Sequence, residues 1–206
     1  MLPTTTKITK EMILNTAFDI AREQGVEKIS NRELAKRMNC SIRPIYYQFK
    51  NVEELNKELY KKIEHYFYKF LIENMIKGIP PYKQIGINYI KFAKTENNLF
   101  KFLFMSETRQ EPSTFVETDE KGFEEVIKAI KISTHLSEKD IKSFHIKMWI
   151  FAHGIATLAA AKSVEFTDEQ IQDLLSQEFQ ALMLLEENPN NKWIIKNYKE
   201  EENEKL

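Results

Sequence analysis

Hydrophobic residues recur at helical spacing, every three or four positions, along most of the chain, and no stretch shows the alternation typical of a strand. The first helical stretch runs from about Thr9 to Gln24 and ends at Gly25. Its apolar face consists of Ile13, Ala17, Ile20 and Ala21. Only five Gly and six Pro occur among the 206 residues, which also favours helix. The pattern therefore predicts an all-α protein.

Two short helices joined by a tight turn are predicted over residues 31–49. Ser30 can cap the first, because its hydroxyl can accept a hydrogen bond from an amide of the first turn. Asn39 follows the last apolar residue, where a helix exit needs a left-handed residue. Ser41 is expected to cap the second helix, and Pro44 lies in its first turn, where a missing amide costs little.

Such a pair of helices is the geometry that lays a second helix in the DNA major groove. Arg43 can contact a guanine edge through two hydrogen bonds, and Lys50 with neighbouring phenol groups can hold phosphates. The candidate DNA-contacting residues are Asn31, Arg32, Ser41, Ile42, Arg43, Pro44, Tyr46, Tyr47 and Lys50. An ordinary helical hairpin with a charged face would show the same spacing, so spacing alone leaves both interpretations open.

A series of short motifs runs from about Lys7 to Leu55. They are Ala17-Phe18, Gly25, Ser30, Leu34-Ala35, Cys40-Ser41, the run Ile45-Tyr46-Tyr47-Gln48-Phe49, and Glu53-Glu54-Leu55. In order and spacing they resemble the DNA-binding head of the TetR/AcrR family of bacterial transcriptional regulators, in which the run would correspond to a Leu-Tyr-x-His-Phe signature. The resemblance implies a helix-turn-helix head on a helical regulatory domain, and a homodimer that binds duplex DNA.

The chain departs from the family pattern at several positions. Asn39 stands where the family usually has Gly, and Gln48 where it often has His. Val52 replaces a common phosphate-contacting Lys, and Arg43 and Pro44 occupy positions often held by small residues. The last three departures bear on base preference and not on the fold.

Composition and charge narrow the class of protein. Hydrophobic residues make up 42% and charged residues 30%, as in a soluble globular chain. Residues 1–50 hold nine Lys and Arg against five Asp and Glu, whereas the whole chain has a net charge of −1. A basic head on an acidic body fits a DNA-facing module joined to another module. The single Cys40 excludes an internal disulfide framework and fits a cytoplasmic protein.

The sequence shows no signal peptide, and its longest apolar run, Met148 to Ala161, is too short to span a bilayer. Residues 1–8 form a polar arm in which Lys7 could touch phosphates. The expected helices cover about 51–76, 82–95, 97–105, 119–134, 138–163 and 167–187, with a loop at 107–118 and a polar tail at 188–206 that contains Trp193, Ile194 and Ile195. With the head, this predicts about nine helices, a helix-turn-helix DNA-binding domain at 1–50 and a helical regulatory domain at 51–206.

The last two long helices carry more apolar surface than a single helix–helix contact within the chain would bury. Gly154, in the middle of the first of them, suggests the close approach of another backbone. In the resembled family these helices form a homodimer. The candidate interface residues are Ala152, Ala156, Ala159, Ala160, Leu175, Phe179, Leu182 and Met183. The alternative is that both helices are buried within one chain.

The body is also rich in aromatic residues, with 14 Phe and 8 Tyr in the chain. Ligand cavities are mostly apolar with a few polar anchors, for which His153, His145 or Tyr89 could serve. The candidate ligand-binding residues are Tyr89, Phe92, Phe100, Phe104, Met105, Trp149 and His153. Each of them could equally be a core residue.

Catalytic signatures are absent from the sequence: it contains no Gly-rich phosphate loop, nucleophile elbow or zinc motif. His145 and His153 lie eight residues apart with no Cys or carboxylate pattern beside them, so we predict no metal, no cofactor and no enzyme activity. The predicted function is a ligand-responsive DNA-binding repressor, a homodimer on a palindromic operator released by a small apolar or aromatic effector, with no membrane partner. The alternatives are an effector-independent DNA-binding protein, an activator without a pocket, and, if the protein shifts no duplex DNA at low salt, an enzyme or a pure protein-interaction module.

Overall fold

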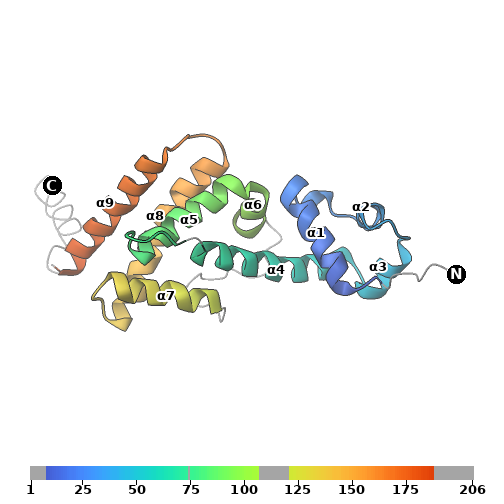
Figure 1. The fold of residues 1–206 in the computed structure, drawn as a ribbon, viewed down its shortest axis with the longest axis horizontal. Coiled ribbons are helices and arrows are strands. Elements are labelled where there is room, and N and C mark those ends of the chain that lie inside the picture. Colours follow the sequence, from blue (N-terminus) through green and yellow to red (C-terminus); the bar gives the residue numbers. More distant parts are fainter. Residues whose placement is uncertain (1–7, 74, 107–120, 188–206) are drawn as a thin grey trace, which may run out of the picture.

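A computed structural model describes residues 8–73, 75–106 and 121–187. The predicted polar arm, the loop at 107–118 and the tail with its apolar residues lie largely or wholly outside these residues. Within them, all regular structure is helical, as predicted. Figure 1 shows an elongated molecule with a small head at one end, a larger body at the other and α4 running between the two.

The head consists of α1 (Lys10–Gln24), the 3-10 turn η1 (Val26–Lys28), α2 (Asn31–Arg37) and α3 (Arg43–Gln48). Its helices meet over a small apolar core whose members are at most 1% exposed: Ile13, Ala17, Ile20, Ala21, Leu34 and Ile45. Gly25 ends α1 at a φ of 94°, a left-handed conformation that favours glycine. The predicted apolar face of the first helix is therefore confirmed.

The turn between α2 and α3 follows local signals in the sequence, with one exception. The Ser30 hydroxyl accepts a hydrogen bond from the Glu33 amide at 3.2 Å, and Asn39 adopts a left-handed φ of 48°. Both were predicted. The prediction that Ser41 caps α3 is wrong, because the helix starts later, with Ile42 as its N-cap and no side-chain cap. Pro44 lies in the first turn of α3, as expected.

Helix α4 (Val52–Ile72) begins at Asn51, whose side-chain oxygen accepts a hydrogen bond from a first-turn amide at 2.8 Å. It ends four residues before the predicted Ile76. The side-chain amide of Asn88, a buried residue of the next helix, donates to the Leu71 carbonyl oxygen at 2.9 Å. This contact satisfies a carbonyl that the end of a helix leaves without a partner.

The body contains α5 (Pro81–Thr95), α6 (Asn97–Met105), α7 (Lys121–Ser133), α8 (Glu138–Ala160) and α9 (Asp168–Glu187). Helix α5 contacts all the other body helices and α4, so the body is assembled around it. The α9 start is capped as predicted, because the Gln170 amide donates to the Thr167 hydroxyl at 3.2 Å. Helix α8 ends at Ala160, before the predicted residue 163. Two residues later Lys162 adopts a left-handed φ of 55°.

One buried carboxylate joins the head to the body. Glu96, at the end of α5, accepts hydrogen bonds from Arg22 of α1, Nε to Oε2 at 2.7 Å and Nη2 to Oε1 at 2.5 Å. The Tyr66 hydroxyl of α4 donates to the same carboxylate at 3.0 Å. The head is thus tied to α4 and α5, and the domain boundary at residue 50 stays a prediction.

Candidate functional site

The outer face of α3 carries exposed aromatic and basic side chains. Tyr46 is 59% exposed and Tyr47 73% exposed, while Ile45 beneath them is buried. Arg43 and Lys50 are also exposed. Large exposed aromatic residues on a short helix are uncommon in a folded chain, because burial of such side chains is favourable. This face is the first candidate site.

Arg43 and Tyr47 form a pair on that face. The Arg43 Nε donates to the Tyr47 hydroxyl at 3.1 Å, and the guanidinium carbon lies 5.7 Å from the centre of the Tyr47 ring. The contact holds the side chain of Arg43 along the helix, so contact with a base edge requires it to turn outward. Ile42 and Pro44 are only half-buried, and Ile42 packs partly against the head's core.

Basic residues of the head divide into two groups. Arg22, Arg37 and Lys10 form ion pairs within the chain, with Glu96, Glu23 and Glu58 respectively. A second group forms no ion pair with any described residue: Lys28, Arg32, Lys36, Arg43 and Lys50. All five are exposed. They leave positive charge at the head surface, where the half-buried Asn31 begins α2.

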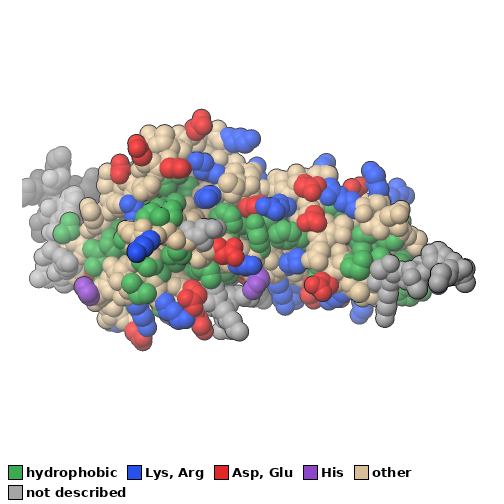
Figure 2. All heavy atoms as spheres, in the orientation of Figure 1, with side chains coloured by type: hydrophobic (Ala, Val, Ile, Leu, Met, Phe, Trp, Pro, Cys, Tyr) green, Lys and Arg blue, Asp and Glu red, His purple; other side chains and the backbone are tan. Residues whose placement is uncertain are grey.

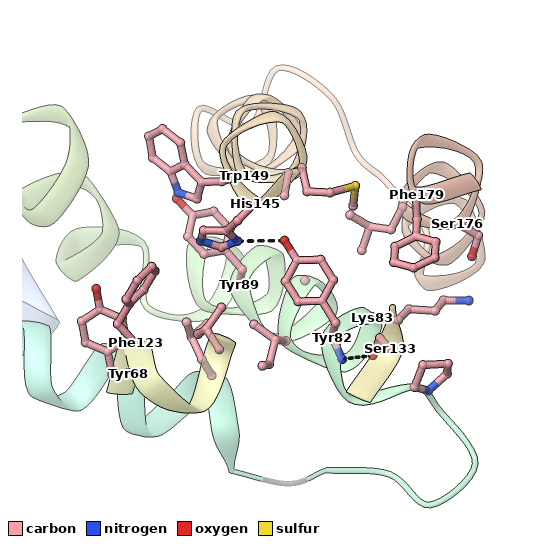
Figure 3. A pocket seen from close by; sticks show the side chains of 18 of the residues that line it. Tyr68, Tyr82, Lys83, Tyr89, Phe123, Ser133, His145, Trp149, Ser176 and Phe179 are labelled. Atoms are coloured by element: carbon pink, nitrogen blue, oxygen red, sulfur yellow. Dashed lines mark hydrogen bonds between the residues drawn. The ribbon is translucent and has the colours of Figure 1, made fainter. Parts of the chain in front are cut away.

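The second candidate site is a cavity of about 350 Å³ inside the body. Helices α4, α5, α7, α8 and α9 all contribute lining residues, as Figure 3 shows for most of them. Most are apolar or aromatic: Phe67, Tyr68, Leu71, Ile85, Tyr89, Phe123, Val126, Met148, Trp149, Ala152, Leu175 and Phe179. The volume falls in the lower part of the usual range for small-molecule sites, roughly 300–1,000 Å³.

A hydrogen-bonded pair of buried side chains lies at the cavity wall. The Tyr82 hydroxyl and His145 Nδ1 are 2.8 Å apart (Figure 3). Burial lowers the pKa of His145 to about 4, so the ring is neutral near pH 7. Burial also raises the pKa of Tyr82, which keeps its phenol protonated. The pair is therefore an uncharged polar anchor in an apolar wall.

Sequence reasoning found only part of this lining. Tyr89 and Trp149 line the cavity, as predicted, and His145 does so too. Phe92 and Phe100 do not, because they are fully buried in an aromatic core where Phe92 packs edge-to-face on Phe67 at 5.1 Å. Phe104 belongs to the same core, and its ring lies 5.3 Å from that of Phe67.

Two further predicted ligand residues lie away from the cavity lining. Met105 is 48% exposed at the end of α6. His153 lies behind the wall, where its Nδ1 is 2.8 Å from the Tyr89 hydroxyl, and burial lowers its pKa. His153 thus positions a lining residue instead of lining the cavity itself.

The predicted dimer-interface residues need a correction. Five of them are buried within this chain: Ala152, Ala156, Ala160, Leu175 and Leu182. Helix α8 packs mainly on α5, and the burial of its three alanines leaves their face unavailable to a second chain. Three of the eight predicted residues instead line the cavity: Ala152, Leu175 and Phe179. Ala159 and Met183 are half-buried.

A different face of α8 is apolar and exposed. Ile146, Ile150 and Leu158 are 39%, 59% and 43% exposed and lie on one stripe. Gly154 completes the four-residue spacing, and a Cβ added there would meet no atom within 4 Å. On the face shown in Figure 2, apolar side chains reach the surface of the body between charged side chains of both signs.

The described part of the chain shows neither a metal site nor a membrane-spanning helix. Those residues contain no group of three or more His, Cys, Asp or Glu that could hold a metal ion. None of their helices is both long and apolar enough to cross a membrane.

Comparison with known proteins gives a consistent result at the level of structure. No protein-family model matches this sequence, and no curated protein matches it in sequence. A TetR-family transcriptional regulator from Haemophilus influenzae matches in structure with a TM-score of 0.56 and 18% identity, over 84% of this chain and 94% of that one. A TetR-like regulator from Rhodococcus sp. RHA1 gives 0.57 and 15%, over 89% and 99%.

A third similar structure is a TetR-family protein from Vibrio parahaemolyticus. Its TM-score is 0.59 at 17% identity, over 83% of this chain and 96% of that one. All three matches cover nearly the whole of the known chains, so the similarity includes both head and body. The protein therefore has the all-α fold of TetR-family transcriptional regulators.

Proposed function

We propose that this protein is a DNA-binding transcriptional regulator that acts as a ligand-responsive repressor in the cytoplasm. A homodimer binds a palindromic operator through its two heads, and a small apolar or aromatic effector in the body releases it. The fold is that of known regulators, and the described residues contain no group of three or more His, Cys, Asp or Glu that could hold a metal ion.

The outer face of α3 is the observation that carries this proposal. Arg43, Tyr46 and Tyr47 are exposed together on the second helix of a helix-turn-helix, and Lys50 is exposed just after that helix ends. A guanidinium can read a guanine edge, and phenol and ammonium groups can hold phosphates. The neighbouring Arg32 adds positive charge that no described carboxylate neutralises, which favours a polyanion.

Dimerisation supplies the second head. A palindrome is read by two helices about one DNA turn apart, which a single head cannot provide. The exposed apolar stripe of Ile146, Ile150 and Leu158 on α8 is suited to self-association, because its burial against a copy of itself removes apolar surface from water. This stripe replaces the small-residue face as the proposed interface.

The cavity supplies the response to an effector. Helix α4 contributes Phe67, Tyr68 and Leu71 to the cavity wall and leads directly from the head. A ligand that fits the cavity better at one tilt of α4 changes the spacing of the two heads. The ligand can shift the equilibrium between the two head spacings by no more than the difference in its binding free energy between them.

Selection of bound duplexes from a random pool tests the proposal. We expect enrichment of an inverted repeat with half-sites about one helical turn apart. The variant Lys142→Ala, an exposed lysine on α8 far from α3, is the matched control and should select the same sequence. Failure to shift any duplex at low salt would rule out DNA binding and favour a protein-interaction module.

The leading alternative is an effector-independent DNA-binding protein or activator without a pocket. A body filled with side chains would favour it, and the 350 Å³ cavity counts against it. The experiment that separates the two adds candidate ligands to the protein–DNA complex. Release of DNA supports the ligand-responsive repressor, whereas DNA binding that no ligand changes supports the alternative without a pocket.

A further inference from the structure

The cavity is nearly free of charge, and what charge it has is of one sign. Lys83 is the only charged side chain among the described lining residues, which include no Asp or Glu. No described residue forms an ion pair with Lys83. His145 is neutral because burial lowers its pKa to about 4. The site therefore offers one cation and no anion to a ligand.

Lys83 lies at one end of the cavity, and its side chain extends towards Ser176 and Phe179 of α9 in Figure 3. Pro80, three residues before Lys83, and Gln180, next to Phe179, also line the cavity and are both exposed, so the cavity opens to solvent beside Lys83. A charged head group at this mouth stays partly hydrated, which limits the cost of its desolvation.

The interior of the cavity is lined by aromatic rings. The ring of Phe67 packs against those of Tyr68 and Tyr89, with centres 5.3 and 5.6 Å away. Figure 3 shows Phe123 and Trp149 on the side of the cavity away from Lys83. Aromatic pairs that meet edge-to-face or offset are stabilised beyond the burial of their area. The wall therefore favours a flat aromatic group over a flexible alkyl chain of the same size.

We propose that the effector is a small aromatic monocarboxylic acid, whose ring lies among the interior aromatic residues and whose carboxylate meets the ammonium of Lys83 at the mouth. This inference rests on the proposed effector role of the cavity and narrows it to one chemical class. A cationic ligand would find no counter-charge in the described lining. A dianion such as a phosphate ester would find only one positive charge, that of Lys83, for its two negative charges.

The Gln180 amide and the Ser176 hydroxyl share this mouth with Lys83. The Ser176 hydroxyl donates to the Gln172 carbonyl at 2.7 Å, so it is oriented by its own helix and retains lone pairs as acceptors. Lys83 and Gln180 thus carry an ammonium and an amide that can donate to a carboxylate. The Tyr82–His145 pair contributes a neutral polar contact deeper in the wall.

Calorimetric titration of the whole protein with three ligands of one skeleton tests the proposal. The probes are phenylbutanoate, phenylbutanamide and phenylbutylamine, which carry a negative, a neutral and a positive head group. We expect the acid to bind about tenfold more tightly than the amide, because one charge-assisted hydrogen bond contributes about that much affinity. The amine should bind most weakly. Octanoate, with the same charge and no ring, should bind more weakly than phenylbutanoate.

Two variants assign the preference to Lys83. Lys83→Met keeps the length of the side chain and removes the charge, so it should erase the preference for the acid and leave amide binding unchanged. Lys83→Arg should retain the preference. Lys142→Met, which changes an exposed lysine on α8, is the control and should behave as the natural protein does.

Equal binding of acid and amide, or a preference that survives Lys83→Met, would overturn the carboxylate assignment. Tighter binding of octanoate would overturn the aromatic one. These titrations contain no DNA, so they stand apart from the proposed regulatory function. Acid binding that leaves a protein–DNA complex intact would refute the effector role and leave the ligand class standing.

Discussion

Protonation of His145 should destabilise the folded protein as the pH falls. The ring is 8% exposed, accepts or donates a hydrogen bond with Tyr82 at 2.8 Å, and lies 5.6 Å from the ring of Phe123. No carboxylate is among these contacts. Burial lowers the pKa of His145 from 6.5 to about 4 in the folded protein. In the unfolded chain the pKa returns to about 6.5.

The sign follows from which state binds more protons. Between the two pKa values the unfolded chain holds the proton and the folded one does not, so folding stability falls as pH falls from about 6.5 to about 4. Each pH unit within that window costs about 1.4 kcal/mol. Between pH 7.5 and pH 5, His145 alone should therefore remove about 2 kcal/mol from the free energy of unfolding.

Urea unfolding at pH 7.5 and pH 5 measures this quantity. His145→Gln keeps a polar group within reach of Tyr82 and removes the titration, so its stability should change by about 2 kcal/mol less over that interval than the natural protein's. His135→Gln, which alters an exposed histidine, is the control and should leave the pH dependence unchanged. An identical pH dependence for His145→Gln and the natural protein would refute the reasoning.

Four further substitutions, one of them with a control, test the head, the junction and the dimer. Arg22→Ala should lower the free energy of unfolding by about 1–2 kcal/mol, because the buried Glu96 carboxylate loses its cationic partner; the loss is limited because Arg22 is half-exposed and the Tyr66 hydroxyl still donates to Glu96. The control, Lys69→Ala, removes an exposed ion pair and should cost under about 1 kcal/mol by the same urea assay. Arg43→Ala should relax base preference by about 1–3 kcal/mol at one position of each half-site in binding selections. Lys50→Ala should weaken all sites alike and reduce the salt slope by about one in fluorescence anisotropy, and a site-specific loss would contradict a phosphate contact. Ile150→Glu should give a monomer in sedimentation equilibrium without unfolding the chain, and a persistent dimer would exclude the proposed stripe.

Helix boundaries could be predicted where one residue carries the signal. Ser30 and Thr167 cap their helices because a hydroxyl in the sequence is enough to satisfy a first-turn amide. Asn39 adopts the left-handed exit for a similarly local reason. The end of α4 could not be predicted, because Asn88, seventeen residues after Leu71, supplies the partner for its last turn. Local patterns do not contain a contact from another helix.

The inward or outward direction of each body residue was harder to predict. Phe92 and Phe67 are aromatic residues at helical spacing in neighbouring helices, yet only Phe67 reaches the cavity. Which of two adjacent rings borders a cavity depends on how α4 and α5 rotate against each other. Ala156 and Ile150 show the same limit on α8, since the small residue packs inward and the large one faces solvent. A helix face made of small residues can pack equally well against another helix of the same chain or against a second copy of the chain.

The arrangement of α4 explains how the two proposed sites can influence each other. Phe67 lines the cavity, and the preceding residue, Tyr66, donates to Glu96 at the head junction. Successive residues of a helix point in directions about 100° apart, so one rotation of α4 moves both side chains. Because Glu96 also holds Arg22 of the head, a ligand that displaces Phe67 must either carry α1 along or weaken that ion pair. Movement of α1 would carry α3 with it, and loss of the ion pair would free the head to move relative to the body. In the proposed dimer either outcome would disturb the spacing of the two heads that a palindromic operator requires.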